Sequence, residues 1–395
     1  MAKHTPSSPN PSQADAAHRI RALLVELAEH GTVLSVRLPD GAELGDANAA
    51  TRVIFHDAVA ADALVQGNHL ALAEAFLEER VDVEGELRDV LRVTDHLDVV
   101  PDRRAALAFW VRFLFDRRRF NRASVAFHYD RPPEFFLSWL GPARCYTHGF
   151  YVSPDDDLAE AETRKLRYAF DALALERGSR VLDMGCGWGS FLEYAGTRGV
   201  AVHGITISRA QYEFVGDLIC KKQLPCTVEL VDFLDYHPEQ DFDAAVFMGS
   251  LEHMPGLRRL ARFLSRHLTA DGRIYADFVT SPEGRMSGRF LRRHIFPGVS
   301  HYVDLPGLLR AVRRAGMTVL ALEEDTLSCA YTVRDWARRL EAVRARLAAH
   351  HGEAAVRAFL LYLWGSHHFL LTNRTQAFHV VAGRGSDVLH GDGAR

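Results

Sequence analysis

The 395-residue sequence lacks most features that would indicate a metalloprotein, a secreted protein or a membrane-spanning protein. It has five cysteines, none in a C-x-x-C pair, so their spacing predicts no metal site. A sparse, odd set of cysteines is typical of a reducing compartment, and we expect a cytoplasmic protein. No run of about 18 or more uncharged apolar residues occurs, so no transmembrane helix is predicted.

The sequence also lacks a strong excess of either charge. Its formal net charge is -4, close to neutral for this length. Proteins that bind nucleic acid through the phosphate backbone carry a basic excess, so we expect no nucleic-acid partner. Apolar residues make up 48% of the chain, which is enough for a full hydrophobic core.

The length allows two domains. Residues 1–14 are polar and contain several Ser and Pro residues, which predicts a disordered tail rather than a signal peptide. Residues 15–100 mix helical and strand patterns and are predicted to form a small α+β domain. Its helices are expected over 16–30, 68–78 and 87–96, and its strands over 32–38 and 51–55. Residues 386–395 are predicted to be a flexible tail.

Residues 101–170 are predicted to be a helical linker that caps the substrate site. Within it, the segment 101–122 combines aromatic side chains with several arginines. One interpretation is a helix packed on the next domain with a solvated basic end. The other is contact with a membrane surface, which would place the protein peripherally at the inner face of the membrane.

Strand and helix patterns alternate from residue 171 to 385, which predicts an α/β fold with a parallel, doubly wound sheet. Strands are expected over 180–184, 201–206, 226–232, 242–248 and 273–278, with helices over 190–197, 209–222 and 257–268. Segments 318–323 and 378–382 could close the sheet. Between these two segments, helices over 331–350 and 353–371 form a helical insertion at about 326–371.

A glycine-rich turn follows the first of these strands. Gly185, Gly187 and Gly189 come directly after Asp183, and glycine lets a backbone adopt positive φ and approach a ligand closely. Such a turn alone could serve NAD or be purely structural. NAD enzymes usually place an acid about 20 residues later, and the corresponding strand end at 204–208 has none. The acid at Asp183 could reach the amino-acid part of S-adenosylmethionine (SAM), so we expect SAM as the cofactor.

The segments Asp183 to Gly189 and Gly204 to Gln211 together resemble the cyclopropane-fatty-acyl-phospholipid synthase family, which includes the mycolic acid cyclopropane synthases. Further matching segments are His128-Tyr129-Asp130, Leu158 to Lys165, Phe242-Asp243, Glu252-His253-Met254 and Ile295-Phe296-Pro297-Gly298. The resemblance covers roughly 120–385 and, more loosely, the N-terminal domain. It implies a class I methyltransferase with a Rossmann-like sheet, which adds the SAM methyl group to a carbon–carbon double bond of a lipid acyl chain.

The resemblance also implies which residues bind the cofactor. Those expected to contact SAM directly are Asp183, Gly185, Gly187, Thr206, Ser208 and Gln211. Asp232 and Phe233 are expected beside the adenine, and Tyr146 and Thr147 near the methionine end.

In the family, a bound bicarbonate acts as the base, held by a Cys backbone, a Glu, a His and a Tyr. Glu252 and Tyr362 match the Glu and the Tyr, whereas His148 replaces the Cys and Asp277 replaces the His. An acid at Asp277 close to Glu252 would repel bicarbonate. We therefore hypothesise that Asp277 or His148, alone or as a pair, is the base. The alternative is that Asp277 is a strand-end acid without a catalytic role.

Three functions are consistent with these patterns. The first is C-methylation of an alkene in a hydrophobic substrate, an unsaturated lipid acyl chain. The second is C-methylation in specialised metabolism, on a small isoprenoid or polyketide alkene, with methylation or cyclisation as the outcome. The third is a lipid-binding or scaffold protein with an inactive fold, which the intact glycine turn and Glu252 disfavour. A homodimer is also considered.

Overall fold

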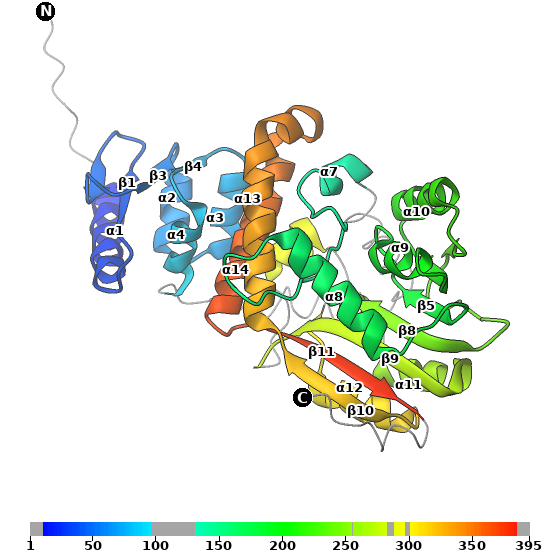
Figure 1. Cartoon of the computed structure of the whole chain (residues 1–395). Coiled ribbons are helices and arrows are strands. Elements are labelled where there is room, and N and C mark those ends of the chain that lie inside the picture. The colour runs from blue at the N-terminus through cyan, green and yellow to red at the C-terminus, as the bar shows by residue number, and fades with distance from the viewer. Residues whose placement is uncertain (1–10, 96–130, 255, 283–287, 297–300, 385–395) are drawn as a thin grey trace, which may run out of the picture. The chain divides into compact units, whose positions relative to one another are not determined.

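The computed structural model describes residues 11–95, 131–254, 256–282, 288–296 and 301–384 (Figure 1). The segment 101–122, the match at His128-Tyr129-Asp130 and the tail at 386–395 lie outside these ranges, as do Pro297 and Gly298. The chain divides into two compact units. The first comprises Met1–Val111 and Arg344–His368, and the second comprises Arg112–Val343 and Phe369–Arg395.

These units differ from the predicted domains in two places. The helical insertion predicted at about 326–371 is divided, because Arg344–His368 belongs to the first unit. The predicted tail at 1–14 is too long, because helix α1 begins at Pro11. A pattern of apolar residues reveals that a helix is amphipathic, but it does not reveal which core the apolar side packs on.

The first unit contains a four-stranded sheet in the order β2-β1-β3-β4. The predicted strands are confirmed as β1 (Leu34–Arg37) and β3 (Thr51–Phe55), which pair in parallel. Two strands that the sequence analysis does not predict, β2 (Glu43–Gly45) and β4 (Val81–Glu84), pair antiparallel at the edges. Alternate residues of β3 are buried, as expected of a strand with one face toward a core.

The described helices of the first unit are α1 (Pro11–Glu29), α2 (Ala58–Val65), α3 (His69–Leu77), α4 (Leu87–Leu91), the 3-10 helix η1 (Arg92–Asp95) and most of α14 (Glu353–Leu371). The three helices predicted here are confirmed with shifted ends, and α2 is an addition. Arg357 of α14 donates to the main-chain oxygens of Phe76 and Val81 and to the Asp82 carboxylate at 2.7 Å. These bonds attach α14 to the end of α3 and to β4.

The second unit is built on a seven-stranded sheet in the order β10-β11-β9-β8-β5-β6-β7. Its strands are β5 (Arg180–Met184), β6 (Ala201–Thr206), β7 (Thr227–Leu230), β8 (Phe242–Met248), β9 (Leu268–Thr280), β10 (Thr318–Glu324) and β11 (Gln376–Gly383). All seven predicted strands are therefore present. The strands β5 to β9 pair in parallel, whereas β11 pairs antiparallel with both β9 and β10.

The helices of the second unit are α7 (Pro133–Leu137), α8 (Leu158–Ala172), α9 (Ser190–Gly196), α10 (Arg209–Lys222), α11 (Leu257–His267), α12 (Leu305–Arg314) and α13 (Thr326–His351), whose last turns belong to the first unit. Two short helices are also described in this unit, the 3-10 helix η2 (Leu251–His253) and the π-helix η3 (Leu291–Ile295). The helices predicted between strands are confirmed as α9, α10 and α11. The α12 helix and the short α7 helix add to the predicted set.

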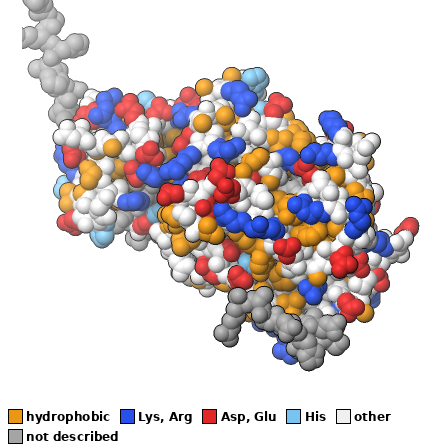
Figure 2. All heavy atoms as spheres, viewed as in Figure 1, with side chains coloured by type: hydrophobic (Ala, Val, Ile, Leu, Met, Phe, Trp, Pro, Cys, Tyr) orange, Lys and Arg blue, Asp and Glu red, His pale blue; other side chains and the backbone are white. Residues whose placement is uncertain are grey.

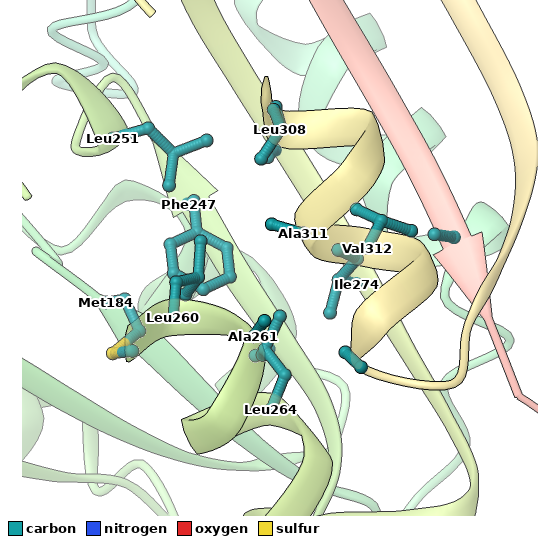
Figure 3. Packing of buried hydrophobic residues seen from close by; sticks show 14 of the residues in the cluster. Met184, Phe247, Leu251, Leu260, Ala261, Leu264, Ile274, Leu308, Ala311 and Val312 are labelled. Carbon is teal, nitrogen blue, oxygen red and sulfur yellow. The ribbon is translucent and has the colours of Figure 1, made fainter. Parts of the chain in front are cut away.

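Successive side chains of each strand point to opposite faces of the sheet, and each face packs into its own hydrophobic core. On one face, Met184, Phe247 and Ile274 pack with α11 and α12 (Figure 3). On the other face, Val181 and Tyr275 pack with α8, α9 and α10. Because side chains in a strand alternate, Asp183 and Asp277 share a face with Val181 and Tyr275. The two acids therefore lie on the side of the sheet covered by α8, near the carboxyl ends of their strands.

Side chains of both charge signs occur across the surface visible in Figure 2, in agreement with a net charge near zero. Among the described residues, no helix is both long and apolar enough to span a bilayer.

Candidate active site

The turn between β5 and α9 forms the floor of a pocket. Gly185, Gly187 and Gly189 have φ of 85°, 52° and 75°, the left-handed region that glycine adopts without strain. The N–H groups of Gly185 and Cys186 both donate to the main-chain oxygen of Ile205 in β6 at 3.0 Å. A Cβ added at Gly187 would meet no protein atom within 4 Å. The turn therefore leaves open space directly above its backbone, where a ligand can approach.

All the predicted cofactor residues except Ser208 line this one pocket, namely Tyr146, Thr147, Asp183, Gly185, Gly187, Thr206, Gln211, Asp232 and Phe233. The pocket lies at the carboxyl ends of β5, β6 and β8, the edge where ligands bind in open α/β sheets. Contact between each of these residues and SAM stays a prediction, but the structure brings them to one place.

Ser208 is not among the described residues that line the pocket, and its contact with SAM stays a prediction. It is the N-cap of α10, and its Oγ accepts a hydrogen bond from the Gln211 N–H at 3.3 Å. Thr206 Oγ1 donates to Gln211 Oε1 at 2.8 Å and accepts from the Ser208 N–H at 3.2 Å. Ser208 therefore acts on the pocket indirectly, by fixing the turn that presents Thr206 and Gln211.

Asp183 is the acid at the base of the pocket. Only 2% of its surface is exposed, and burial, with a smaller contribution from the charge of Asp277, raises its pKa to about 7. Desolvation favours the neutral acid, so an ammonium group placed beside it would restore the charged form. SAM carries such an amino group on its methionine part.

Aromatic rings pack around Tyr146 at one side of the pocket. Its ring centroid lies 5.5 Å from that of Phe136, 5.6 Å from that of Trp139 and 5.4 Å from that of Trp336. Sequence analysis identified Tyr146 but none of these three neighbours, which come from α7, the segment after it and α13. Aromatic faces stabilise positive charge, so this cluster suits a reaction that passes through a cation.

Glu252 lies in η2, beyond the carboxyl end of β8. Its Oε1 accepts a hydrogen bond from the Val279 N–H of β9 at 2.8 Å, while its Oε2 is buried without a hydrogen-bond partner in the described part of the chain. Burial raises the pKa of Glu252 to about 7, partly opposed by the Val279 N–H, and the charge of Asp277 adds to the rise. Near neutral pH this carboxyl group can therefore hold or release a proton.

Asp277 is buried on β9, with 1% of its surface exposed. Its Oδ2 lies 3.4 Å from Lys165 Nζ and accepts from the Tyr275 hydroxyl at 3.5 Å. Its Oδ1 is buried and has no hydrogen-bond partner among the residues that the structure describes. Lys165 belongs to a segment that matches the family, but the sequence does not indicate that it pairs with Asp277, because 112 residues separate the two.

The hypothesis of a His148–Asp277 pair is wrong. His148 Nε2 lies 3.2 Å from Asp325 Oδ2, and the same oxygen is 2.6 Å from His379 Nδ1. Both imidazoles are buried, and Asp325 lies at the junction of β10 and α13. Burial opposes the charge of Asp325, but hydrogen bonds from the two histidines lower its pKa to about 2. The two histidines therefore share a carboxylate that no motif in the sequence indicated.

Tyr362, the remaining predicted catalytic residue, lies on α14 in the first unit. Its catalytic role stays a prediction. Within the described parts of the chain, no group of three or more His, Cys, Asp or Glu side chains is placed to hold a metal ion.

The open space above Gly187 generates a test of the pocket. We expect Gly187→Ala to lower the affinity for S-adenosylhomocysteine (SAH) at least about tenfold, because the added methyl group occupies ligand space. Gly316→Ala is the matched control, since Gly316 also has a positive φ (75°) and open space around an added Cβ. Titration calorimetry and melting temperatures check this. Equal SAH affinity in both variants would show that the ligand lies elsewhere.

The His148–Asp325–His379 cluster predicts a pH-dependent contribution to stability. The carboxyl group of Asp325 is more acidic in the folded chain, so its contribution is full above its ordinary pKa of about 3.9 and is lost as pH falls through about 2. We expect Asp325→Asn to reduce the free energy of unfolding by about 2 kcal/mol at pH 7. Denaturant unfolding between pH 7 and 2 should show the difference shrinking below pH 4, with exposed Asp304→Asn as control. A difference independent of pH would contradict it.

Comparison with known proteins agrees with this geometry. The family model for mycolic acid cyclopropane synthetase matches residues 116–380, and one for a domain of unknown function matches residues 28–96. A probable fatty acid methyltransferase of Pseudomonas putida is 28% identical over 318 residues, covering 74% of this chain and 77% of that protein. Cyclopropane mycolic acid synthase 3 of Mycobacterium tuberculosis is 28% identical over 260 residues, covering 61% and 90%.

Solved structures show the same fold. The mycolic acid cyclopropane synthase CmaA1, complexed with SAH and CTAB, has a TM-score of 0.61 at 25% identity, covering 67% of this chain and 98% of that one. The family match covers more than half of the sequence and contains the glycine turn, Glu252 and Asp277. The chain therefore belongs to the mycolic acid cyclopropane synthetase family and is a SAM-dependent methyltransferase.

Proposed function

We propose that this enzyme methylates a carbon–carbon double bond in an unsaturated lipid acyl chain. The observation that carries the proposal is a glycine-turn pocket lined by Tyr146, in a unit where two buried carboxyl oxygens, of Glu252 and Asp277, have no hydrogen-bond partner among the described residues. The names of the relatives above, which refer to fatty acids and mycolic acids, support a lipid substrate.

The reaction determines what the site must supply. SAM, when bound, supplies an electrophilic methyl group and leaves as SAH. The alkene donates its electron pair to form the new carbon–carbon bond, which leaves a positive charge on the neighbouring carbon. A base must then accept a proton. If the proton leaves the added methyl group directly, a cyclopropane closes; if it leaves a neighbouring chain carbon, a methyl branch beside a re-formed double bond results. If a hydride first shifts to the cationic carbon, loss of a proton from the added methyl group gives a methylene branch.

The described residues fit these requirements. The Tyr146 ring lines the pocket and is backed by buried aromatic rings, and its face can stabilise the cation. Tight walls also hold a weak nucleophile in line with the methyl group, which lowers the entropic cost of the reaction. Asp183, with 2% of its surface exposed, would hold the amino group of SAM.

Asp277 suits the role of the base better than His148. Its Oδ1 is buried and unpartnered, so it can accept the proton, whereas His148 Nε2 is bonded to Asp325. The charge of Asp277 also contributes to the raised pKa of Glu252, which means that the two acids interact electrostatically. A bicarbonate anion placed between them would be repelled by Asp277. The carboxylate of Asp277 would take its place.

The substrate class can be tested in a bacterial host. We expect expression of the enzyme to add one CH2 unit to a fraction of the unsaturated phospholipid acyl chains, measured by mass spectrometry. Gly187→Ala serves as the cofactor-deficient control. Unchanged acyl chains, together with SAM-dependent methylation of a small isoprenoid or polyketide alkene by the purified enzyme, would favour the second function.

The identity of the base makes a separate prediction. We expect Asp277→Asn to lower kcat by about 10²–10⁴-fold, because a positioned base contributes that much. The wild-type enzyme should turn over equally fast in carbonate-stripped and bicarbonate-supplemented buffer. Asp217→Asn, at an exposed position on α10, is the control. Strict dependence on bicarbonate would contradict the assignment.

A further inference from the structure

Lys165 is a lysine buried inside the second unit. It lies on α8 with 0% of its surface exposed, and its Nζ contacts two side chains on other elements. It donates a hydrogen bond to Thr147 Oγ1, and it lies 3.4 Å from Asp277 Oδ2. An ammonium group is costly to bury, so such a residue needs compensating partners.

The surroundings of Lys165 are rich in carboxyl groups. Glu162, one turn earlier on α8, is also fully buried, and burial raises its pKa to about 7 even though Lys165 opposes the rise. Asp183 and Glu252 also have raised pKa values. Asp277 differs from Asp183 and Glu252 because the Lys165 ammonium group lies 3.4 Å from its Oδ2. The positive charge of Lys165 stabilises the carboxylate form, the form in which Asp277 can accept a proton.

The two oxygens of Asp277 have different environments. Oδ2 is near both Lys165 and the Tyr275 hydroxyl, whereas Oδ1 has no partner. With Oδ2 occupied, the carboxylate is held in one orientation and presents Oδ1. Lys165 therefore sets both the charge and the direction of the proposed base.

The contact with Thr147 reaches the cofactor pocket. Lysine has only hydrogen-bond donors, so Thr147 Oγ1 must accept and its own hydrogen must point elsewhere. Within the described part of the chain, no acceptor for that hydrogen is found. Thr147 lines the pocket, and its Cγ2 packs where a Cβ on Gly249 would collide. The hydroxyl hydrogen is thus available to an acceptor in the pocket, such as a ligand carboxylate.

We propose that Lys165 is a positioning residue that couples the two halves of the reaction, orienting Thr147 toward the carboxylate of the cofactor and Asp277 toward the substrate. The second half rests on the proposed function. The first half concerns cofactor binding alone and can be tested without any alkene.

Cofactor binding is measured by titrating SAH into the full-length chain. We expect Thr147→Val and Lys165→Met each to lower the affinity about tenfold, the loss typical of one hydrogen bond to a charged group. The double variant should bind no more weakly than either single variant, because both changes remove the same bond. Additive losses would overturn the coupling through Thr147. Lys221→Met is the control, since Lys221 is 77% exposed on α10.

The single variant Lys165→Met leaves the buried Asp277 carboxylate without its cation, which could unfold the chain. The charge-neutral double variant Lys165→Met/Asp277→Asn is therefore measured as well. We expect this double variant to bind SAH about tenfold more weakly than Asp277→Asn alone does. Equal affinity would show that Lys165 only neutralises charge, and the proposal would fail.

The effect on the base is read from kcat on the acyl substrate. We expect Lys165→Met to lower kcat at least about tenfold, because Asp277 Oδ2 loses the ammonium group that holds it, and Lys165→Arg to restore most of the loss. An unchanged kcat in Lys165→Met, or no rescue by Lys165→Arg, would overturn the coupling to Asp277. A wild-type enzyme inactive on acyl chains, with the binding results as expected, would refute only the proposed function.

Discussion

The arrangement of the site depends on how buried carboxyl groups are accommodated near the carboxyl edge of the second unit's sheet. Asp183, Glu252 and Asp277 are all withdrawn from water, and their charges interact. Burying an uncompensated charge costs more free energy than a domain can usually spare. The structure meets this cost in two ways: burial raises the pKa values of Asp183 and Glu252, and Lys165 lies beside Asp277. The result is a set of buried acids with different electrostatic surroundings near one pocket.

The same constraint explains the second polar cluster. His148 follows Thr147 directly, and its imidazole shares the Asp325 carboxylate with His379 of β11. Hydrogen bonds therefore connect the loop that lines the cofactor pocket to β11 and to the residue before α13. Departures from the family pattern at His148 and Asp277 thus do not leave charges without partners, because each residue lies within hydrogen-bonding distance of a partner of its own.

The sequence predicted the sheet of the second unit well. All seven of its strands were expected, and three of the helices between them were placed within a residue or two of their ends. This succeeds because buried strands and amphipathic helices have distinct apolar periods, and because three glycines mark the turn after β5. The elements that escaped prediction, such as α7, β2 and β4, are short, so that few residues carry a periodic signal.

What the sequence determined by itself was local: the strand ending at Asp183, the glycine turn, and the residue types at 148, 252 and 277. The tertiary structure decided the partners. Lys165 contacts Asp277 although 112 residues separate them in the sequence, and His148 contacts Asp325 although 177 residues separate them. It also decided that Arg344–His368 belongs with the first unit. Such pairings arise when α8 packs on the sheet and β11 inserts beside β9, and no spacing along the chain encodes them, because distance in space is set by packing.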